Sequence, residues 1–119
     1  MPPYLLRPAA TDIEWWIIKG ETYDIEIPVL DDGDVLVDVT GYTAKAQVRR
    51  SEHEDVLHEW SAAKIECVGP NVVLHVLAAD TSAWTWTDAM VSVETYAPIT
   101  GVPRVIAQGP IHALPEYTR

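Results

Sequence analysis

The chain has 119 residues, of which 48% are hydrophobic and 22% are charged, which is the balance of an ordinary globular protein and excludes a disordered one. This length predicts one domain with one core. Eight basic and eighteen acidic residues give a formal net charge of −10, which disfavours nucleic acid and anionic membrane surfaces as partners. The charge serves solubility, and it also fits docking against a basic partner.

The lone cysteine, Cys67, can form no internal disulfide, which fits synthesis in a reducing compartment. The first residues lack the basic start and long apolar run of a secretory signal. No stretch approaches the ~18 apolar residues of a membrane span. We therefore expect a soluble protein that is made in the cytoplasm.

Residues 1–11 are rich in proline and lack alternation, so we predict an extended arm ahead of a single β-sandwich domain over residues 12–119. The domain is expected to open with a strand at 13–18. Neighbouring side chains on a strand point to opposite faces. One of Trp15 and Trp16 is therefore expected to enter the core, and the other to be exposed or covered by a partner.

Alternation with a period of two residues continues along the chain and is typical of half-buried strands. Residues 22–29, for example, place Tyr23 and Ile25 on one face and Asp24 on the other. The remaining expected strands are 35–37, 42–49, 56–60, 65–68, 72–77, 90–96 and 104–108.

Turn signals separate these strands at short intervals. The clearest are Lys19-Gly20, Asp31-Asp32-Gly33-Asp34, Thr40-Gly41, Gly69-Pro70-Asn71 and the segment 98–103. About seven to nine short strands with this spacing predict an all-β, antiparallel sandwich or barrel.

One segment departs from the alternation. Residues 80–84 begin with Asp80, a good N-cap, and predict a single helical turn that ends at Trp84. Such a turn would carry the chain from one sheet to the other. Trp84 or Trp86 is then expected to close the end of the sandwich.

Candidates for metal chemistry among the histidines are poor. The four histidines are scattered, and no spacing places two of them as ligands on one helical face; they are His53, His58, His75 and His112. His75 lies opposite the apolar face of its expected strand, so we expect it to face solvent.

Three aspartates around Gly33 superficially suggest a calcium loop, but no closing glutamate follows, and Asp31, Asp32 and Asp34 are predicted to form a tight turn. Cys67 is interpreted as a small core residue. No serine lies in a nucleophile elbow, and no phosphate-binding loop is present. We expect no enzymatic activity, no cofactor and no metal.

The order of the motifs carries a resemblance. These motifs are the Trp15-Trp16 strand, Lys19-Gly20-Glu21-Thr22-Tyr23, Asp32-Gly33, the run 38–49, Asp80-Thr81-Ser82-Ala83-Trp84-Thr85-Trp86, the strand 90–96 and the ending 106–119. In this order they resemble the immunoglobulin-like β-sandwich domain of tailed-bacteriophage tail proteins. That family includes collar proteins that anchor side tail fibres and the N-terminal domains of baseplate upper proteins. The resemblance covers residues 12–119.

This resemblance implies an immunoglobulin-like sandwich and a virion structural protein, a connector of the tail tip, collar or baseplate. The implied partners are copies of the chain in a homo-oligomeric ring and other phage structural proteins. The implied location is the virion, after synthesis in the host cytoplasm. Baseplate upper proteins continue beyond the sandwich, whereas this sequence ends there, which favours a connector over a receptor binder.

Two other functions stay open at this point. One is a capsid decoration protein, and the other is a carbohydrate-binding module that recognises host surface glycans through an exposed tryptophan. Partner contacts are predicted for residues of the arm and for tryptophans. They are Tyr4, Leu5, Leu6, Trp15, Trp16, Trp60, Trp84 and Trp86.

Overall fold

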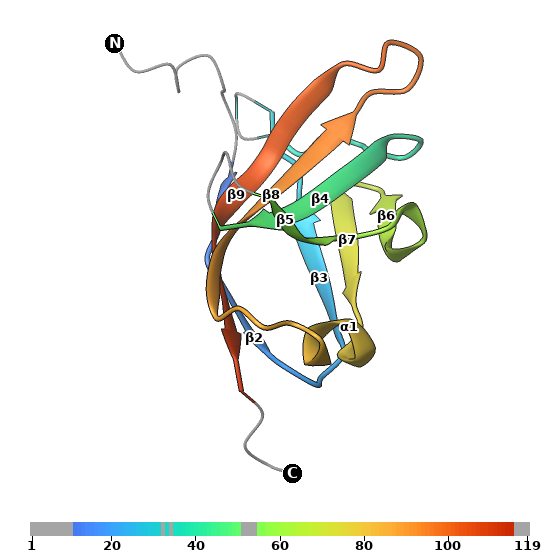
Figure 1. Ribbon diagram of the computed structural model, residues 1–119. Helices are drawn as coiled ribbons and strands as arrows, with labels where there is room; N and C mark the ends of the chain where they lie inside the picture. The colour runs from blue at the N-terminus through green and yellow to red at the C-terminus, as the bar shows by residue number, and fades with distance from the viewer. Residues whose placement is uncertain (1–10, 32, 34, 51–54, 116–119) are drawn as a thin grey trace, which may run out of the picture.

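Two β-sheets face each other across the core of the computed structural model (Figure 1). The structure describes residues 11–31, 33, 35–50 and 55–115. The elements are β1 (Thr11–Asp12), β2 (Trp15–Ile18), β3 (Tyr23–Pro28), β4 (Thr43–Arg49), β5 (Val56–Glu59), η2 (Ala62–Lys64), β6 (Ile65–Val68), β7 (Asn71–Val76), α1 (Ala78–Ser82), β8 (Asp88–Tyr96) and β9 (Pro103–Leu114). No helix in these ranges is long and apolar enough to cross a lipid bilayer.

The strand order matches that of an immunoglobulin-type sandwich. Sheet A has the order β1-β9-β8-β4-β5, with β2 also paired to β9, and sheet B has the order β3-β7-β6. The strands β9-β8-β4-β5 correspond to G, F, C and C′ of a variable-type domain, and β3-β7-β6 correspond to B, E and D. The predicted all-β sandwich with a short helix is confirmed.

The N-terminal strands correct the prediction of antiparallel pairing. β1 and β2 both run parallel to β9, with Thr11 opposite Ala107 and Trp15 opposite Ile111. β2 continues into β3 of the other sheet, so no hairpin joins it to β9 and its direction is free. The predicted arm, residues 1–11, is one residue too long, because Thr11 belongs to β1. Residues 1–10 lie outside the described residues.

β9 is longer than predicted, and Gly109 explains how the N-terminal chain lies on it. Strand β9 continues past residue 108 to Leu114. The backbone between β1 and β2 passes so close that a Cβ on Gly109 would lie 1.8 Å from the Ile13 carbonyl oxygen. The Ile13 amide donates a hydrogen bond to the Gln108 carbonyl at 3.1 Å. A residue without a side chain is required at this crossing.

The helical turn begins earlier than predicted. α1 spans Ala78–Ser82 and Leu77 occupies the N-cap, so Asp80 lies inside the helix and does not cap it. Asp80 instead forms an ion pair with Lys64 at 2.9 Å. The buried Thr81 hydroxyl accepts a hydrogen bond from the Gly20 amide at 2.9 Å, which ties α1 to the turn after β2.

A second predicted element is reduced to a single bridge. The segment 35–37 forms no strand; Leu36 makes one isolated antiparallel bridge with Leu30. Asp31 accounts for this loop, since its carboxylate accepts hydrogen bonds from the amides of Gly33 and Val35 at 2.8 and 3.0 Å. The prediction of a tight turn is confirmed for Asp31, whereas Asp32 and Asp34 lie outside the described residues.

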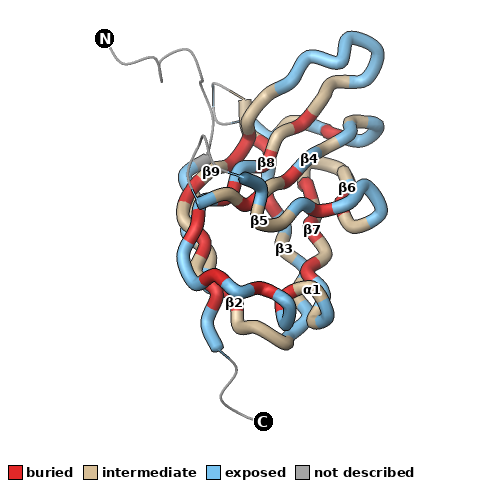
Figure 2. The backbone as a smooth tube through the Cα atoms, in the orientation of Figure 1, coloured by how far each residue is buried: buried red, intermediate tan, exposed pale blue. Residues whose placement is uncertain are grey.

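The core lies between the inner faces of the two sheets, where buried positions alternate with exposed ones along the strands (Figure 2). Its centre consists of fully buried aliphatic side chains from both sheets. The largest are Leu74, Ile106, Ile111, Val39, Val48, Val72, Val76, Val91 and Val93. The core positions the outward-facing residues of each strand on two solvent-facing sheet surfaces.

Candidate binding surfaces

The two adjacent tryptophans of β2 lie on opposite faces, as predicted. Trp15 is partly buried and packs against the core, whereas the Trp16 side chain is 58% exposed on the outer face of sheet A. Trp16 is therefore the predicted contact tryptophan that is available to a partner.

Burial corrects the contact prediction for the other three tryptophans. Trp60, Trp84 and Trp86 were expected at a partner surface, but their exposed fractions are only 3%, 7% and 4%. The other expectation for Trp84 and Trp86, that one of them closes the end of the sandwich, is consistent with their burial in the core. Trp84 and Trp86 stack with ring centroids 4.6 Å apart. Tryptophan was placed at the surface because its N–H group seeks a polar partner. Here the large ring area is used to fill the space between the sheets.

His58 completes this buried cluster, which we define as His58, Trp60, Trp84 and Trp86. Its ring meets Trp60 and Trp84 edge to face, at centroid distances of 4.7 and 5.2 Å. Desolvation lowers the pKa of His58, and the Lys64 ammonium lowers it further, against the opposing effect of Asp80. None of the three indole Nε1–H groups in the cluster finds an acceptor among the described residues.

Trp16 belongs to a second aromatic group, which lies on the outer face of sheet A. Its indole stacks on His112 with ring centroids 4.0 Å apart and planes inclined by 24°. His112 Nδ1 bonds Asp88 at 2.6 Å, and Nε2 bonds Glu14 at 2.8 Å. We call Glu14, Trp16, Asp88 and His112 the edge cluster, because β2 pairs with β9 alone and forms the border of the sheet.

Strand register brings the edge cluster together. Trp16 lies opposite His112 in the parallel pair of β2 and β9, and His112 lies opposite Asp88 in the antiparallel pair of β8 and β9. The pKa of His112 is raised, first by its hydrogen bond to the Asp88 carboxylate and then by the one to Glu14. The two carboxylates thus favour protonation of the ring that stacks on the indole, and Trp16 keeps 58% of its surface exposed.

Sheet B carries a similar group on its outer face. His75 Nδ1 lies 2.7 Å from Asp24, and Nε2 lies 3.4 Å from Glu66. The hydrogen bond that His75 makes to the Asp24 carboxylate is the main cause of its raised pKa. Among the described residues no aromatic ring stacks on His75, so this group links three strands without offering an apolar platform. The predicted outward position of His75 is confirmed.

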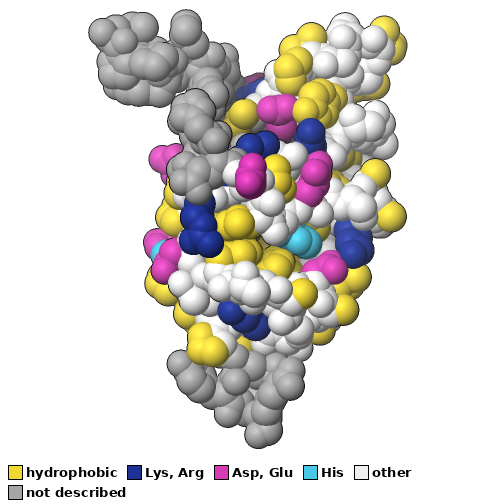
Figure 3. All heavy atoms as spheres, viewed as in Figure 1, with side chains coloured by type: hydrophobic (Ala, Val, Ile, Leu, Met, Phe, Trp, Pro, Cys, Tyr) yellow, Lys and Arg dark blue, Asp and Glu magenta, His cyan; other side chains and the backbone are white. Residues whose placement is uncertain are grey.

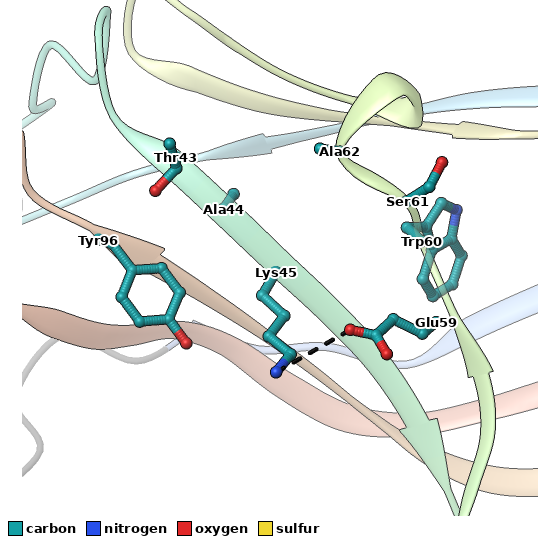
Figure 4. Close-up of a pocket in the computed structure, with 8 residues that line it drawn as sticks. All are labelled: Thr43, Ala44, Lys45, Glu59, Trp60, Ser61, Ala62 and Tyr96. Atoms are coloured by element: carbon teal, nitrogen blue, oxygen red, sulfur yellow. Dashed lines mark ion pairs between the residues drawn. The ribbon is translucent and has the colours of Figure 1, made fainter. Parts of the chain in front are cut away.

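An open cavity of about 630 Å³ lies beside β4 and the end of β5 (Figure 4). Part of its polar lining is paired, since Lys45 and Glu59 form an ion pair at 3.9 Å and the Tyr96 hydroxyl bonds Glu94, whereas the Trp60 Nε1–H has no acceptor among the described residues. Cavities of this size can hold small ligands, but those sites direct several free polar groups at the ligand. This cavity has no such convergence and does not define a chemical reaction.

The described residues contain no group of three or more histidine, cysteine or acidic side chains arranged to hold a metal ion. Cys67 is partly buried against the core, and desolvation raises the pKa of its thiol. The predicted contact residues Tyr4, Leu5 and Leu6, and the fourth histidine, His53, lie outside the described residues.

The edge cluster was missed by sequence reasoning, which treated His112 as an isolated histidine. Glu14 and His112 are 98 positions apart in the chain. The strand expected near the end of the chain stopped at residue 108, before His112, and the parallel register that makes β2 and β9 neighbours carries no local sequence signal.

Hydrophobic side chains are also exposed on the loops. The tip between β8 and β9 carries Ile99, which is fully exposed, and Val102, which is 59% exposed. Figure 3 shows hydrophobic groups over this tip, at the upper end of the molecule. Val35 and Leu36, on another loop, are about as exposed as Val102.

No protein-family model matches the chain, and no curated protein matches it.

Proposed function

We propose that this protein is a structural component of a tailed-bacteriophage virion, a connector of the tail tip, collar or baseplate that works through protein–protein contacts. The virion assignment depends on the motif order that resembles phage tail domains. The described fold supports it at the level of architecture, because the strand order is that of an immunoglobulin-type sandwich.

One observation carries the structural role. Most of the exposed large apolar side chains among the described residues lie on edge strands, at strand ends or on loops, where a neighbouring protein can reach them, and none lines the cavity; Met90, on the outer face of β8, is the exception to this placement. Trp16 and Ile99 are the clearest cases. Exposed apolar groups with polar surroundings are typical of protein contact sites.

Detection in particles tests this proposal. We expect the protein in purified phage particles by mass spectrometry, and on the tail by cryo-electron microscopy. A position on the capsid surface would support the alternative of a decoration protein. Absence from particles would contradict both.

Deletion of residues 1–10 tests the role proposed for the arm. We expect the truncated chain to keep its circular dichroism spectrum, because the core strands begin after this segment. We expect its self-association or its incorporation into particles to weaken, as measured by light scattering and by cryo-electron microscopy. Unchanged assembly would remove the arm from the proposal.

A carbohydrate-binding module is a second candidate because Trp16 is an exposed aromatic platform flanked by Glu14 and Asp88. Sugar rings stack on such platforms, and their hydroxyl groups bond neighbouring polar side chains. Binding on a glycan array that is lost in Trp16→Ala would support this candidate. Incorporation into particles without glycan binding would count against it.

A further inference from the structure

We infer that the edge cluster is a docking site for a basic side chain, an arginine or lysine presented by a partner protein. The inference deepens the proposed structural role and rests on it for the partner being a protein. Four features carry it: the position of the cluster, the rigidity of Trp16, the acceptor chemistry around it and the charge of the chain.

The position leaves the site open to a neighbour. β2 is paired on one side only, so it forms the border of sheet A, and Trp16 projects from it with 58% of its surface exposed. Glu14 and Asp88 are also accessible, with side chains 53% and 73% exposed. The indole and both carboxylates are therefore accessible to a ligand.

The indole is held in place before any partner arrives. His112 covers one ring face at 4.0 Å, and His112 is itself fixed by bonds to Asp88 and Glu14 at 2.6 and 2.8 Å. A side chain that is already ordered loses little conformational entropy on binding. Preordered aromatic residues of this kind are frequent energetic centres of interfaces.

The polar chemistry favours a donor over a sugar. Both His112 nitrogens are occupied, and the neighbouring Thr87 hydroxyl is bonded to Asp88 at 3.3 Å. What these side chains offer to a ligand is therefore carboxylate oxygens, which only accept hydrogen bonds. A sugar hydroxyl both donates and accepts, whereas a guanidinium or ammonium group only donates.

The shape and the charge of the edge cluster also favour a basic side chain. A guanidinium plane stacks on an indole and can bond an adjacent carboxylate at the same time. Two carboxylates flank one imidazole in the edge cluster, so the site is negative whether the ring is neutral or protonated. The whole chain carries −10, which attracts a basic partner.

The test is an NMR titration with single-residue probes at constant ionic strength. The probes are N-acetyl-arginine amide, N-acetyl-citrulline amide, which has the same length without the charge, and methyl β-galactopyranoside. Binding is followed at the Trp16 indole N–H and at the backbone amides of residues 14 and 112. The Trp16 indole resonance is assigned with the Trp16→Phe variant.

We expect a saturable response to the arginine probe with a dissociation constant on the order of tens of mM. The citrulline probe should bind about three-fold more weakly than the arginine probe, or more weakly still. Glu14→Gln should weaken arginine binding about three-fold. Glu26→Gln, which removes the same charge from the exposed face of sheet B, should change it far less. Trp16→Ala should abolish the response of the backbone amides.

Each of the following results of the titration would overturn the inference: no arginine response, an equal response to citrulline, or an equal loss in Glu14→Gln and Glu26→Gln. A response confined to the galactoside would also overturn it and assign the site to glycans. Particle incorporation separates this inference from the proposed function. If wild type and Trp16→Ala incorporate equally well, the docking site is wrong and the structural role stands; if wild type is absent from particles, the virion role is wrong and the titration alone decides the site's chemistry.

Discussion

Among the described residues, tryptophan contacts histidine in two clusters, and the pKa values of the two histidines shift in opposite directions. In the edge cluster, carboxylates bond both nitrogens of His112 and raise its pKa. In the buried cluster, His58 lies among indole rings, and desolvation lowers its pKa. The comparison shows that aromatic contact alone does not set the protonation state, which depends on whether a counter-charge or a loss of water dominates.

The two clusters also differ in what their tryptophans stabilise. Trp60, Trp84 and Trp86 remove large apolar areas from water, whereas Trp16 leaves more than half of its surface in water. Burial therefore makes the first cluster a determinant of folding stability. Exposure leaves the second available for binding.

The largest expected effect separates these two uses. Trp86→Ala should lower the free energy of unfolding by about 3–5 kcal/mol, because it leaves a cavity in a packed core. Trp16→Ala, the matched control, should cost below about 1 kcal/mol, since only its stacking on His112 is lost. Urea denaturation followed by circular dichroism measures both. Equal losses would show that the edge cluster is part of the folding core.

Gly109→Ala should disturb the edge cluster without removing any of its side chains. The new methyl group would overlap the Ile13 carbonyl oxygen, so the segment carrying Glu14 and Trp16 must move away from β9. We expect a loss of about 3 kcal/mol in the free energy of unfolding. Amide hydrogen exchange should accelerate in β1 and β2 and stay slow in β7. Gly33→Ala is the control, because its Cβ would meet only the Asp31 carboxylate at 3.5 Å.

Whether the sequence predicts a cluster depends on the kind of information that determines the cluster. Alternation along one strand suffices to place Trp15 and Trp16 on opposite faces, because the faces of a strand are a local property, but it does not say which of the two enters the core. The fate of Trp60, Trp84 and Trp86 depends on how much space separates the sheets, which no local pattern encodes. Residue preference then pointed to the surface, and packing overrode it.

The edge cluster needs information of a third kind. Glu14, Asp88 and His112 come from three separate segments, and their meeting depends on the parallel placement of β2 along β9. Strands that are joined by short turns reveal their pairing, as the segment around Gly69 and Pro70 does for β6 and β7. No turn joins β2 to β9, so neither the pairing nor its direction could be predicted.

A pH titration sharpens the contrast between the histidines. We expect the His112 ring to titrate above the ordinary value of 6.5 and the His58 ring below it, observed by NMR and assigned with single His→Gln variants. The stabilisation from protonated His112 is complete below that ordinary value and is lost as the pH rises through the folded-state pKa. For His58 the sign is reversed. The unfolded chain protonates first, so stability falls as the pH drops below 6.5 toward its folded-state pKa.

The smallest effect tests whether the carboxylate is the cause of the His112 shift. Asp88→Asn removes the group that contributes most to the raised pKa, so His112 should titrate closer to its ordinary value, while Glu14 keeps part of the shift. Asp24→Asn is the matched control on sheet B and should move His75 alone. Neither substitution should change His58, whose pKa is governed by burial. If Asp88→Asn left His112 unchanged, Glu14 or the stacking on Trp16 would have to account for the shift, and Asp88 would not be its main cause.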